Sequence, residues 1–204
     1  MFHVRQGFLC VLLMLLLFFL ANAAGVPREV APDALIKEVT LDVLSVINED
    51  QDIRSERLLE LVEEKILPHL DIAHMTRLAL GKHWRDATPR EREELTQEFQ
   101  ILLVRTYGSM LALARGKTVS FKKARMSPED TEAVIEVVVK EGSESVKFQL
   151  RMEKTEEGWK VYDLLVEGVS LIMAQRSTFS REIERGGIDG LIEALRNKNH
   201  SFKK

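Results

Sequence analysis

The chain has 204 residues, with 29 lysines and arginines against 32 aspartates and glutamates, and a formal net charge of −3 at pH 7. This mildly negative balance argues against nucleic acid as a partner, because phosphate binding needs a basic surface. The single cysteine, Cys10, excludes a disulfide within the chain.

The first two dozen residues are predicted to be a secretion signal. His3 and Arg5 form a short positive head, and an unbroken apolar run covers residues 8–20. That run is shorter than the ~20 apolar residues that span a bilayer, which disfavours the alternative of an uncleaved membrane anchor. Residues 21–23 are Ala-Asn-Ala, and the two alanines provide the small side chains that a signal peptidase recognises before its cleavage site. We therefore expect residues 1–23 to be removed.

The mature chain is predicted to hold one domain. Residues 24–32, with two prolines, read as a linker, residues 33–199 as the domain, and residues 200–204 as a polar tail. About this length of chain is enough to bury a sizeable core. Apolar residues recur at helical spacing over 35–47 and again over 58–66, which predicts two helices that pack on that core.

A third helix is predicted over residues 71–80, and three histidines lie near it. Asp71 can cap its start. His69, His74 and His83 raise the question of a metal site. A helix brings together residues three or four apart, whereas His69 and His74 are five apart and Asp71 is used by the cap. We therefore expect no metal site.

A long helix is predicted over residues 89–114. Its first half is charged, which indicates a solvated face, and its second half is apolar. Leu103, Tyr107 and Leu111 lie in that apolar half, with Tyr107 expected near the mouth of any cavity. Gly108 lies among them. A glycine inside a helix lowers the stability of the helix by ~1 kcal/mol relative to alanine, so its presence often indicates that another group approaches the helix closely.

Beyond residue 116 the apolar period changes from helical to alternating. The alternation predicts four strands, over residues 119–121, 133–140, 146–152 and 159–166. Short turns connect them, so they should form an antiparallel meander with its apolar face toward the helices. The expected fold class is α+β, with helices packed on one face of a four-stranded antiparallel sheet.

The last predicted strand turns directly into a helix. Ser170 is placed to cap that helix. This corner is mostly apolar, and we expect the acid Asp163 on the strand to pair with the base Arg176 on the helix. A final helix is predicted over residues 188–196, followed by a frayed tail beyond Asn197.

Two blocks of the sequence resemble the signatures of the MlaC family. The C-terminal block contains WKVYD, VEGVSL and QRSTF within residues 159–179. The upstream block contains Pro68 and Asp71, then the run ALGKHWR with Gly81 and Trp84. Together they extend the resemblance over nearly the whole mature chain. Members of this family, also called toluene-tolerance proteins, are periplasmic phospholipid-binding auxiliary components of an ABC transport system in Gram-negative bacteria.

The resemblance implies a monomeric shuttle, not an enzyme, that carries lipids across the periplasm and maintains outer-membrane lipid asymmetry. Its implied partners are phospholipid as cargo, an inner-membrane ABC transporter with a lipid-binding subunit, and an outer-membrane lipoprotein–porin complex. No cofactor is implied. The cavity residues expected between sheet and helices are Leu103, Tyr107, Leu111, Val137, Val139, Phe148, Leu150, Val161 and Ile172. Gly81, Trp84, Asp163 and Arg176 are expected to be structural.

Several alternatives stay open at this point. The same layers could form a cone-like enzyme that uses Asp163 with Tyr107 or His83 in an apolar pocket. They could also form a ligand-free periplasmic adaptor with a filled core. Periodicity does not distinguish a core from a cavity wall, because both use the same residues. The cargo could be a phospholipid or a hopanoid-like lipid, and the direction of transport is open.

Overall fold

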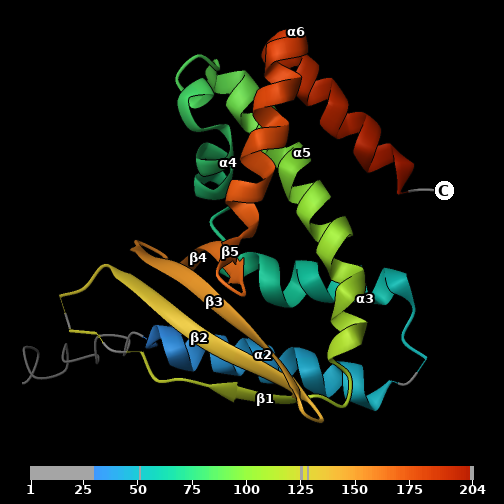
Figure 1. Ribbon diagram of the computed structural model, residues 1–204, viewed down its shortest axis with the longest axis vertical. Coiled ribbons are helices and arrows are strands. Elements are labelled where there is room, and N and C mark those ends of the chain that lie inside the picture. The colour runs from blue at the N-terminus through green and yellow to red at the C-terminus, as the bar shows by residue number, and fades with distance from the viewer. Residues whose placement is uncertain (1–29, 51, 125, 128, 203–204) are drawn as a thin grey trace, which may run out of the picture. The chain divides into compact units, whose positions relative to one another are not determined.

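The computed structural model describes residues 30–202 apart from positions 51, 125 and 128, and it consists of helices around a single sheet (Figure 1). The helices are α2 (Pro32–Glu49), α3 (Ser55–Leu61), α4 (Ile72–Leu80), α5 (Pro89–Gly108) and α6 (Leu171–Ser201). Short helical turns are η1 (Val62–Ile66), η2 (Leu67–His69), η3 (Gly81–Trp84) and η4 (Ser109–Ala114). None of the helices in the described part of the chain has both the length and the apolarity that crossing a membrane requires. The predicted signal at residues 1–23 lies outside the described residues.

The sheet is antiparallel, and its five strands follow one another in chain order. The strands are β1 (Thr118–Phe121), β2 (Glu132–Glu141), β3 (Glu144–Thr155), β4 (Gly158–Val166) and β5 (Val169–Ser170). The first four confirm the predicted meander, and β5 adds a two-residue strand on the edge of β4. Pairing aligns Phe121, Val137, Phe148, Val166 and Val169 in one line across all five strands. Since directly paired residues face the same side, these residues form an apolar row that crosses the sheet.

A bulge in β4 changes which of its residues share the apolar face. Leu164 pairs with Leu150, but Val161 pairs with Met152, so Tyr162 is the extra residue. Strict alternation would put Leu164 and Val161 on opposite faces. The bulge instead puts both of them opposite apolar residues of β3.

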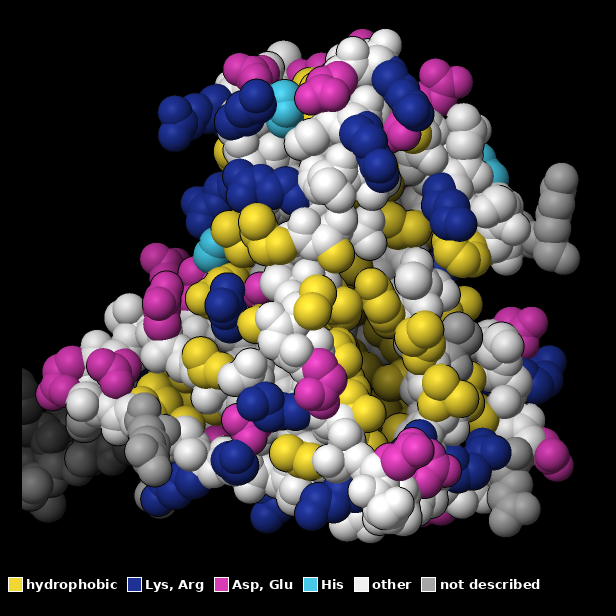
Figure 2. Space-filling view, in the orientation of Figure 1, with side chains coloured by type: hydrophobic (Ala, Val, Ile, Leu, Met, Phe, Trp, Pro, Cys, Tyr) yellow, Lys and Arg dark blue, Asp and Glu magenta, His cyan; other side chains and the backbone are white. Residues whose placement is uncertain are grey.

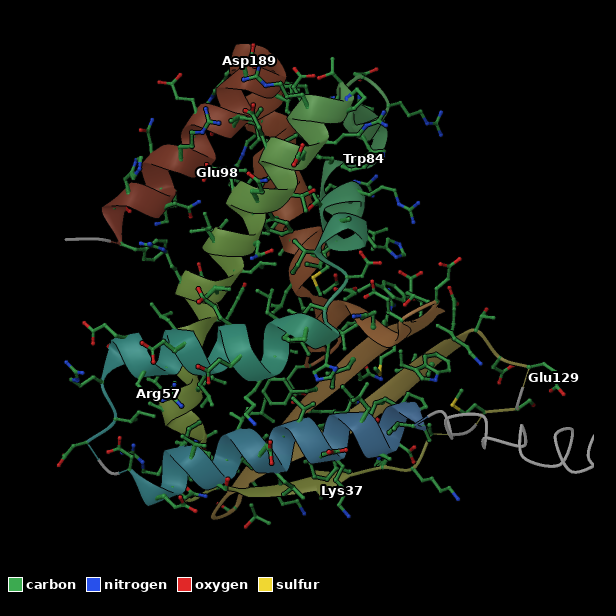
Figure 3. The ribbon with its side chains drawn as sticks, turned by 180° about the vertical axis from the view of Figure 1, so that it is seen from behind. Lys37, Arg57, Trp84, Glu98, Glu129 and Asp189 are labelled. Carbon is green, nitrogen blue, oxygen red and sulfur yellow. The ribbon has the colours of Figure 1, made fainter. Side chains whose placement is uncertain are left out.

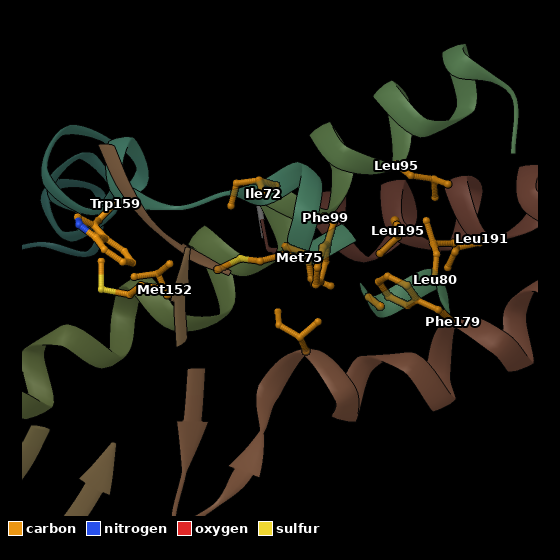
Figure 4. Close-up of a cluster of buried hydrophobic side chains, with 14 of the residues drawn as sticks. Ile72, Met75, Leu80, Leu95, Phe99, Met152, Trp159, Phe179, Leu191 and Leu195 are labelled. Atoms are coloured by element: carbon orange, nitrogen blue, oxygen red, sulfur yellow. The ribbon is translucent and has the colours of Figure 1, made fainter. Parts of the chain in front are cut away.

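The buried apolar residues form two separate clusters. The larger one joins α4, α5 and α6 to one end of the sheet, and its members Phe99 and Phe179 meet edge to face with ring centroids 5.2 Å apart (Figure 4). The smaller cluster lies between α2 and α3 and contains Val43, Ile47, Leu58 and Leu61. The core of this domain is therefore divided.

The C-terminal helix is longer than its sequence predicts. The two predicted helical segments join into α6, which breaks only at Gly187, where φ is 68°. The tail expected to fray beyond Asn197 stays helical to Ser201. Asn199 explains this, because its side-chain amide donates to the Glu98 carbonyl at 2.9 Å and to the Glu98 carboxylate at 2.8 Å. The helix predicted to end at residue 114 passes into the tighter turn η4 after Gly108.

Asp163 stabilises the corner between β4 and α6 through partners other than the expected one. Ser170 caps α6 as predicted, accepting from the Met173 amide at 3.0 Å, and its hydroxyl donates to Asp163 Oδ1 at 2.8 Å. Arg151 Nη1 lies 3.5 Å from Asp163 Oδ2. The partners of Asp163 are thus Ser170 and Arg151 rather than Arg176. Arg176 stands more than a turn into α6, where it points to α4.

Gly81 and Trp84 hold the turn after α4. Gly81 has φ 57° and ψ −120°, and a Cβ placed on it would lie 2.0 Å from Arg176 Nη2. The guanidinium of Arg176 therefore packs directly on the glycine. The Arg92 guanidinium lies over the Trp84 ring, with its central carbon 5.0 Å from the ring centroid. Arg92 Nε also donates to the backbone carbonyl of Trp84 at 3.0 Å. From behind, Trp84 lies beside α4, far from Lys37 on α2 (Figure 3).

We expect Gly81→Ala to lower the free energy of unfolding by ~1–3 kcal/mol, because alanine is strained at this φ and ψ and its methyl group displaces Arg176. Urea denaturation measures the loss. The same change in an Arg176→Ala background should cost less, since the clash is gone. Equal costs in both backgrounds would show that the packing of Arg176 on Gly81 contributes nothing.

Asp163→Asn should destabilise the protein by ~1–3 kcal/mol, since the carboxylate is 2% exposed and asparagine introduces a buried amide without an acceptor. Ser170→Ala removes the cap and should cost ~1 kcal/mol. Thermal unfolding of both variants provides the comparison. An Asp163→Asn protein with an unchanged midpoint would mean that this corner does not depend on the carboxylate.

Candidate functional site

An apolar hollow opens between the sheet and α5 (Figure 2). Its walls are hydrophobic side chains, and it lies between the β3 to β5 side of the sheet and the lower half of α5. The hollow lies between the two buried clusters described above. Leu103 packs against the larger cluster and Leu111 against the smaller one, so the end of α5 and η4 bridge the gap.

The sheet supplies one wall of the hollow from the less covered end of its apolar face. Ile135 and Met152, at the covered end, are fully buried. Val139, Phe148 and Leu150, further along the same face, are only half-buried. One apolar surface is thus sealed by helices at one end and open at the other.

The opposite wall comes from α5 and η4, where Leu103, Tyr107 and Leu111 are half-buried. Gly108 does allow a close approach, but by the protein itself, since a Cβ there would lie 2.8 Å from Leu59 Cδ2. The glycine therefore brings α5 onto α3 and holds the wall in place. It does not itself offer a surface to a ligand.

The nine residues predicted to contact lipid divide into two groups. Six are the half-buried residues of the two walls, namely Leu103, Tyr107, Leu111, Val139, Phe148 and Leu150. The other three, Val137, Val161 and Ile172, are 6%, 3% and 3% exposed and belong to the larger cluster. These three therefore form core next to the hollow.

Further half-buried apolar residues, which were not predicted as part of the site, lie on β4 and α2. Leu164 and Val166 are half-buried and pair with Leu150 and Phe148, which the bulge in β4 makes possible. Leu35 and Val39 on α2 are also half-buried. The sequence predicts the helical stripe of α2, but as part of the core.

A second concavity, of about 730 Å³, lies on the other face of the sheet and is polar in character. Lys122 and Glu136 pair across it, and this hydrogen bond holds the pKa of the Glu136 carboxyl below its usual range. Burial, followed by the charge of Glu132, raises the pKa of Tyr162 at its rim. Its charged lining makes it a poor match for acyl chains.

Asp71, His74 and Glu153 are the one group of potential metal ligands found among the described residues, each with an atom within 4.8 Å of the others. The amide of His74 donates to Asp71 Oδ1 at 2.7 Å, so Asp71 caps α4 as predicted. His74 contacts Glu153 and stacks on Tyr162 with ring centroids 4.7 Å apart. The positive end of the α4 dipole disfavours a cation here. We interpret the group as a set of contacts that holds α4 on the sheet. The spacing of residues along the chain does not predict it, because Glu153 is distant in sequence.

The alternative enzyme would need Asp163 beside Tyr107 or His83. Asp163 is bound by Ser170 and Arg151 at the corner of α6. The carboxylate nearest to His83 is Asp86, whose Oδ2 lies 3.9 Å from Nδ1. The described contacts therefore do not assemble that pair.

This chain is similar in sequence and in fold to known proteins. The family model described as "MlaC protein" matches residues 37–197. A similar protein is the intermembrane phospholipid transport system binding protein MlaC of Haemophilus influenzae, 20% identical over 192 residues that cover 91% of this chain and 89% of the relative. A solved structure of a phospholipid-binding protein from Ralstonia solanacearum, in complex with a phospholipid, is 35% identical with a TM-score of 0.77. It covers 84% of this chain and 98% of its own. The chain belongs to the MlaC family.

Proposed function

We propose that this protein is a periplasmic carrier that binds a phospholipid by its acyl chains in the apolar hollow. The observation that carries the proposal is the divided core, which leaves half-buried apolar walls facing each other on β3 and α5. Membership of the MlaC family supports the same conclusion, as does the phospholipid in the related solved structure.

The cost of moving a lipid through water explains why such walls are needed. A phospholipid with two long chains has about thirty methylenes, and exposing each costs ~0.8 kcal/mol, so transfer into water costs ~20 kcal/mol or more. A carrier must offset this with an equally apolar surface. The opening of the hollow to solvent lets the headgroup stay hydrated, which avoids the cost of burying it unpaired.

Direction does not arise from such binding, because a carrier that matches the bilayer in free energy loads and unloads with equal ease. We propose that partners provide it: an outer-membrane lipoprotein–porin complex and the lipid-binding subunit of an inner-membrane ABC transporter. On this proposal the protein helps to maintain outer-membrane lipid asymmetry.

The proposal predicts that Val139→Trp removes lipid without unfolding the protein. Val139 is half-buried at the open end of β2, so an indole there should occupy the hollow. Protein purified from a bacterial host should yield phospholipid on solvent extraction, measured by mass spectrometry against protein concentration. The lipid species found also distinguishes a phospholipid from a hopanoid-like cargo.

Ala133→Trp is the matched control, because Ala133 lies on the same face of the same strand but is buried at its covered end. Overpacking there should destabilise the protein by ~1–3 kcal/mol and leave the lipid content per folded molecule unchanged. If wild-type protein carries no lipid, or if both variants behave like Ala133→Trp, the hollow is not the binding site.

A further inference from the structure

A cationic face lies on α4, η3 and the first half of α6. It consists of four exposed side chains, Arg77, Lys82, Arg85 and Arg176. Arg176 belongs to this group because its guanidinium packs on Gly81, in the turn between Arg77 and Lys82. Dark-blue side chains gather over this part of the molecule in Figure 2, although the whole chain is mildly acidic.

The four cations lack carboxylate partners among the described residues. Two other surface arginines of α6 are paired with carboxylates, Arg185 with Glu182 and Arg196 with Glu94 and Glu98, while Arg181 contacts the Thr178 hydroxyl. Asp86 is the acid nearest in sequence, and it lies by His83. A group of unpaired like charges is unfavourable by itself, so an anionic partner would stabilise it.

Exposed apolar side chains continue this face toward the hollow. Val169, the last member of the apolar row across the sheet, is 63% exposed, and Met173 at the start of α6 is 45% exposed. Arg176 Nη1 lies 3.9 Å from Met173 Sδ. The apolar row thus ends at β5, next to the start of α6, where Met173 and Arg176 begin the cationic face.

We propose that this combined surface, the cationic face with Val169 and Met173, docks on a bilayer that contains anionic phospholipid. Guanidinium groups bind phosphate with two parallel hydrogen bonds, and three of the four cations are arginines. Apolar side chains beside them can enter the headgroup region. The inference rests on the proposed function for the reason why the protein would visit a bilayer.

The apolar row favours a bilayer over an acidic protein as the partner. Acidic charge alone would account for the cations but not for the exposed Val169 and Met173, whereas an anionic bilayer offers both a charged surface and an apolar interior. Docking on a bilayer would place the open edge of the sheet at headgroup level. Acyl chains could then move between the bilayer and the hollow along the row, with little exposure to water.

Vesicle co-sedimentation tests the docking directly. The full mature protein is mixed with vesicles of phosphatidylcholine alone, or of phosphatidylcholine and phosphatidylglycerol in a two-to-one ratio. We expect binding to the anionic vesicles only, weakening as salt rises. The triple variant Arg77→Gln/Lys82→Gln/Arg85→Gln should bind them about a hundredfold more weakly, since each cation near such a surface contributes about a fivefold gain.

The matched control is Lys37→Gln/Arg54→Gln/Lys140→Gln, which removes three exposed cations from α2, the α3 entry and β2. It should bind like wild type. Three results would overturn the docking proposal. The wild-type protein could fail to bind anionic vesicles at low salt, or it could bind neutral vesicles with equal affinity. The variant Arg77→Gln/Lys82→Gln/Arg85→Gln could also bind anionic vesicles as tightly as wild type. Solvent extraction of the same protein preparations before vesicles are added reports their lipid content independently, so an empty protein would overturn the proposed function and not the docking.

Discussion

The apolar face of the sheet extends beyond the helices that cover it. At the covered end, α4, α5 and α6 bury Ile135 and Met152 completely, while at the other end Phe148 and Leu150 stay half-buried. The second buried cluster lies between α2 and α3 and contains no residue of the sheet, so it does not bury the open end of this face. Contiguous apolar surface of this kind is typical of binding surfaces, because burying it against a partner is favourable relative to hydration.

The position of α5 decides whether this surface is open or closed. Its upper part packs into the larger cluster through Phe99, and its lower part follows α3 because Gly108 admits Leu59. The helix is thus held at both ends against separate clusters, and Leu103 and Tyr107 lie between them. A wall fixed in this way can face an apolar ligand without collapsing onto the sheet.

Much of the fold could be predicted from the sequence, because alternation and helical spacing report which residues are buried. The four predicted strands and the Ser170 and Asp71 caps follow from such patterns. The bulge at Tyr162 could not be predicted, because it interrupts alternation without changing composition.

Contacts between residues that are distant in sequence could not be predicted either. Asp163 binds Arg151 across the sheet, and Glu153 reaches His74, and no local pattern reports either contact. The distinction between hollow and core also depends on how far α5 stands from the sheet. The close approach of Leu59 to Gly108, which holds the end of α5 on α3, is likewise not visible in the spacing along the chain.

The most direct test of a lipid-holding hollow is to map where an acyl chain lies. A phosphatidylcholine with a photoreactive diazirine near the middle of one chain is loaded into the protein, activated, and located by peptide mass spectrometry. We expect labels on the segments that contain Leu103 to Leu111 and Phe148 to Leu150. Labels gathered on the polar concavity around Val134 and Tyr162, or none above a free-diazirine control, would contradict it.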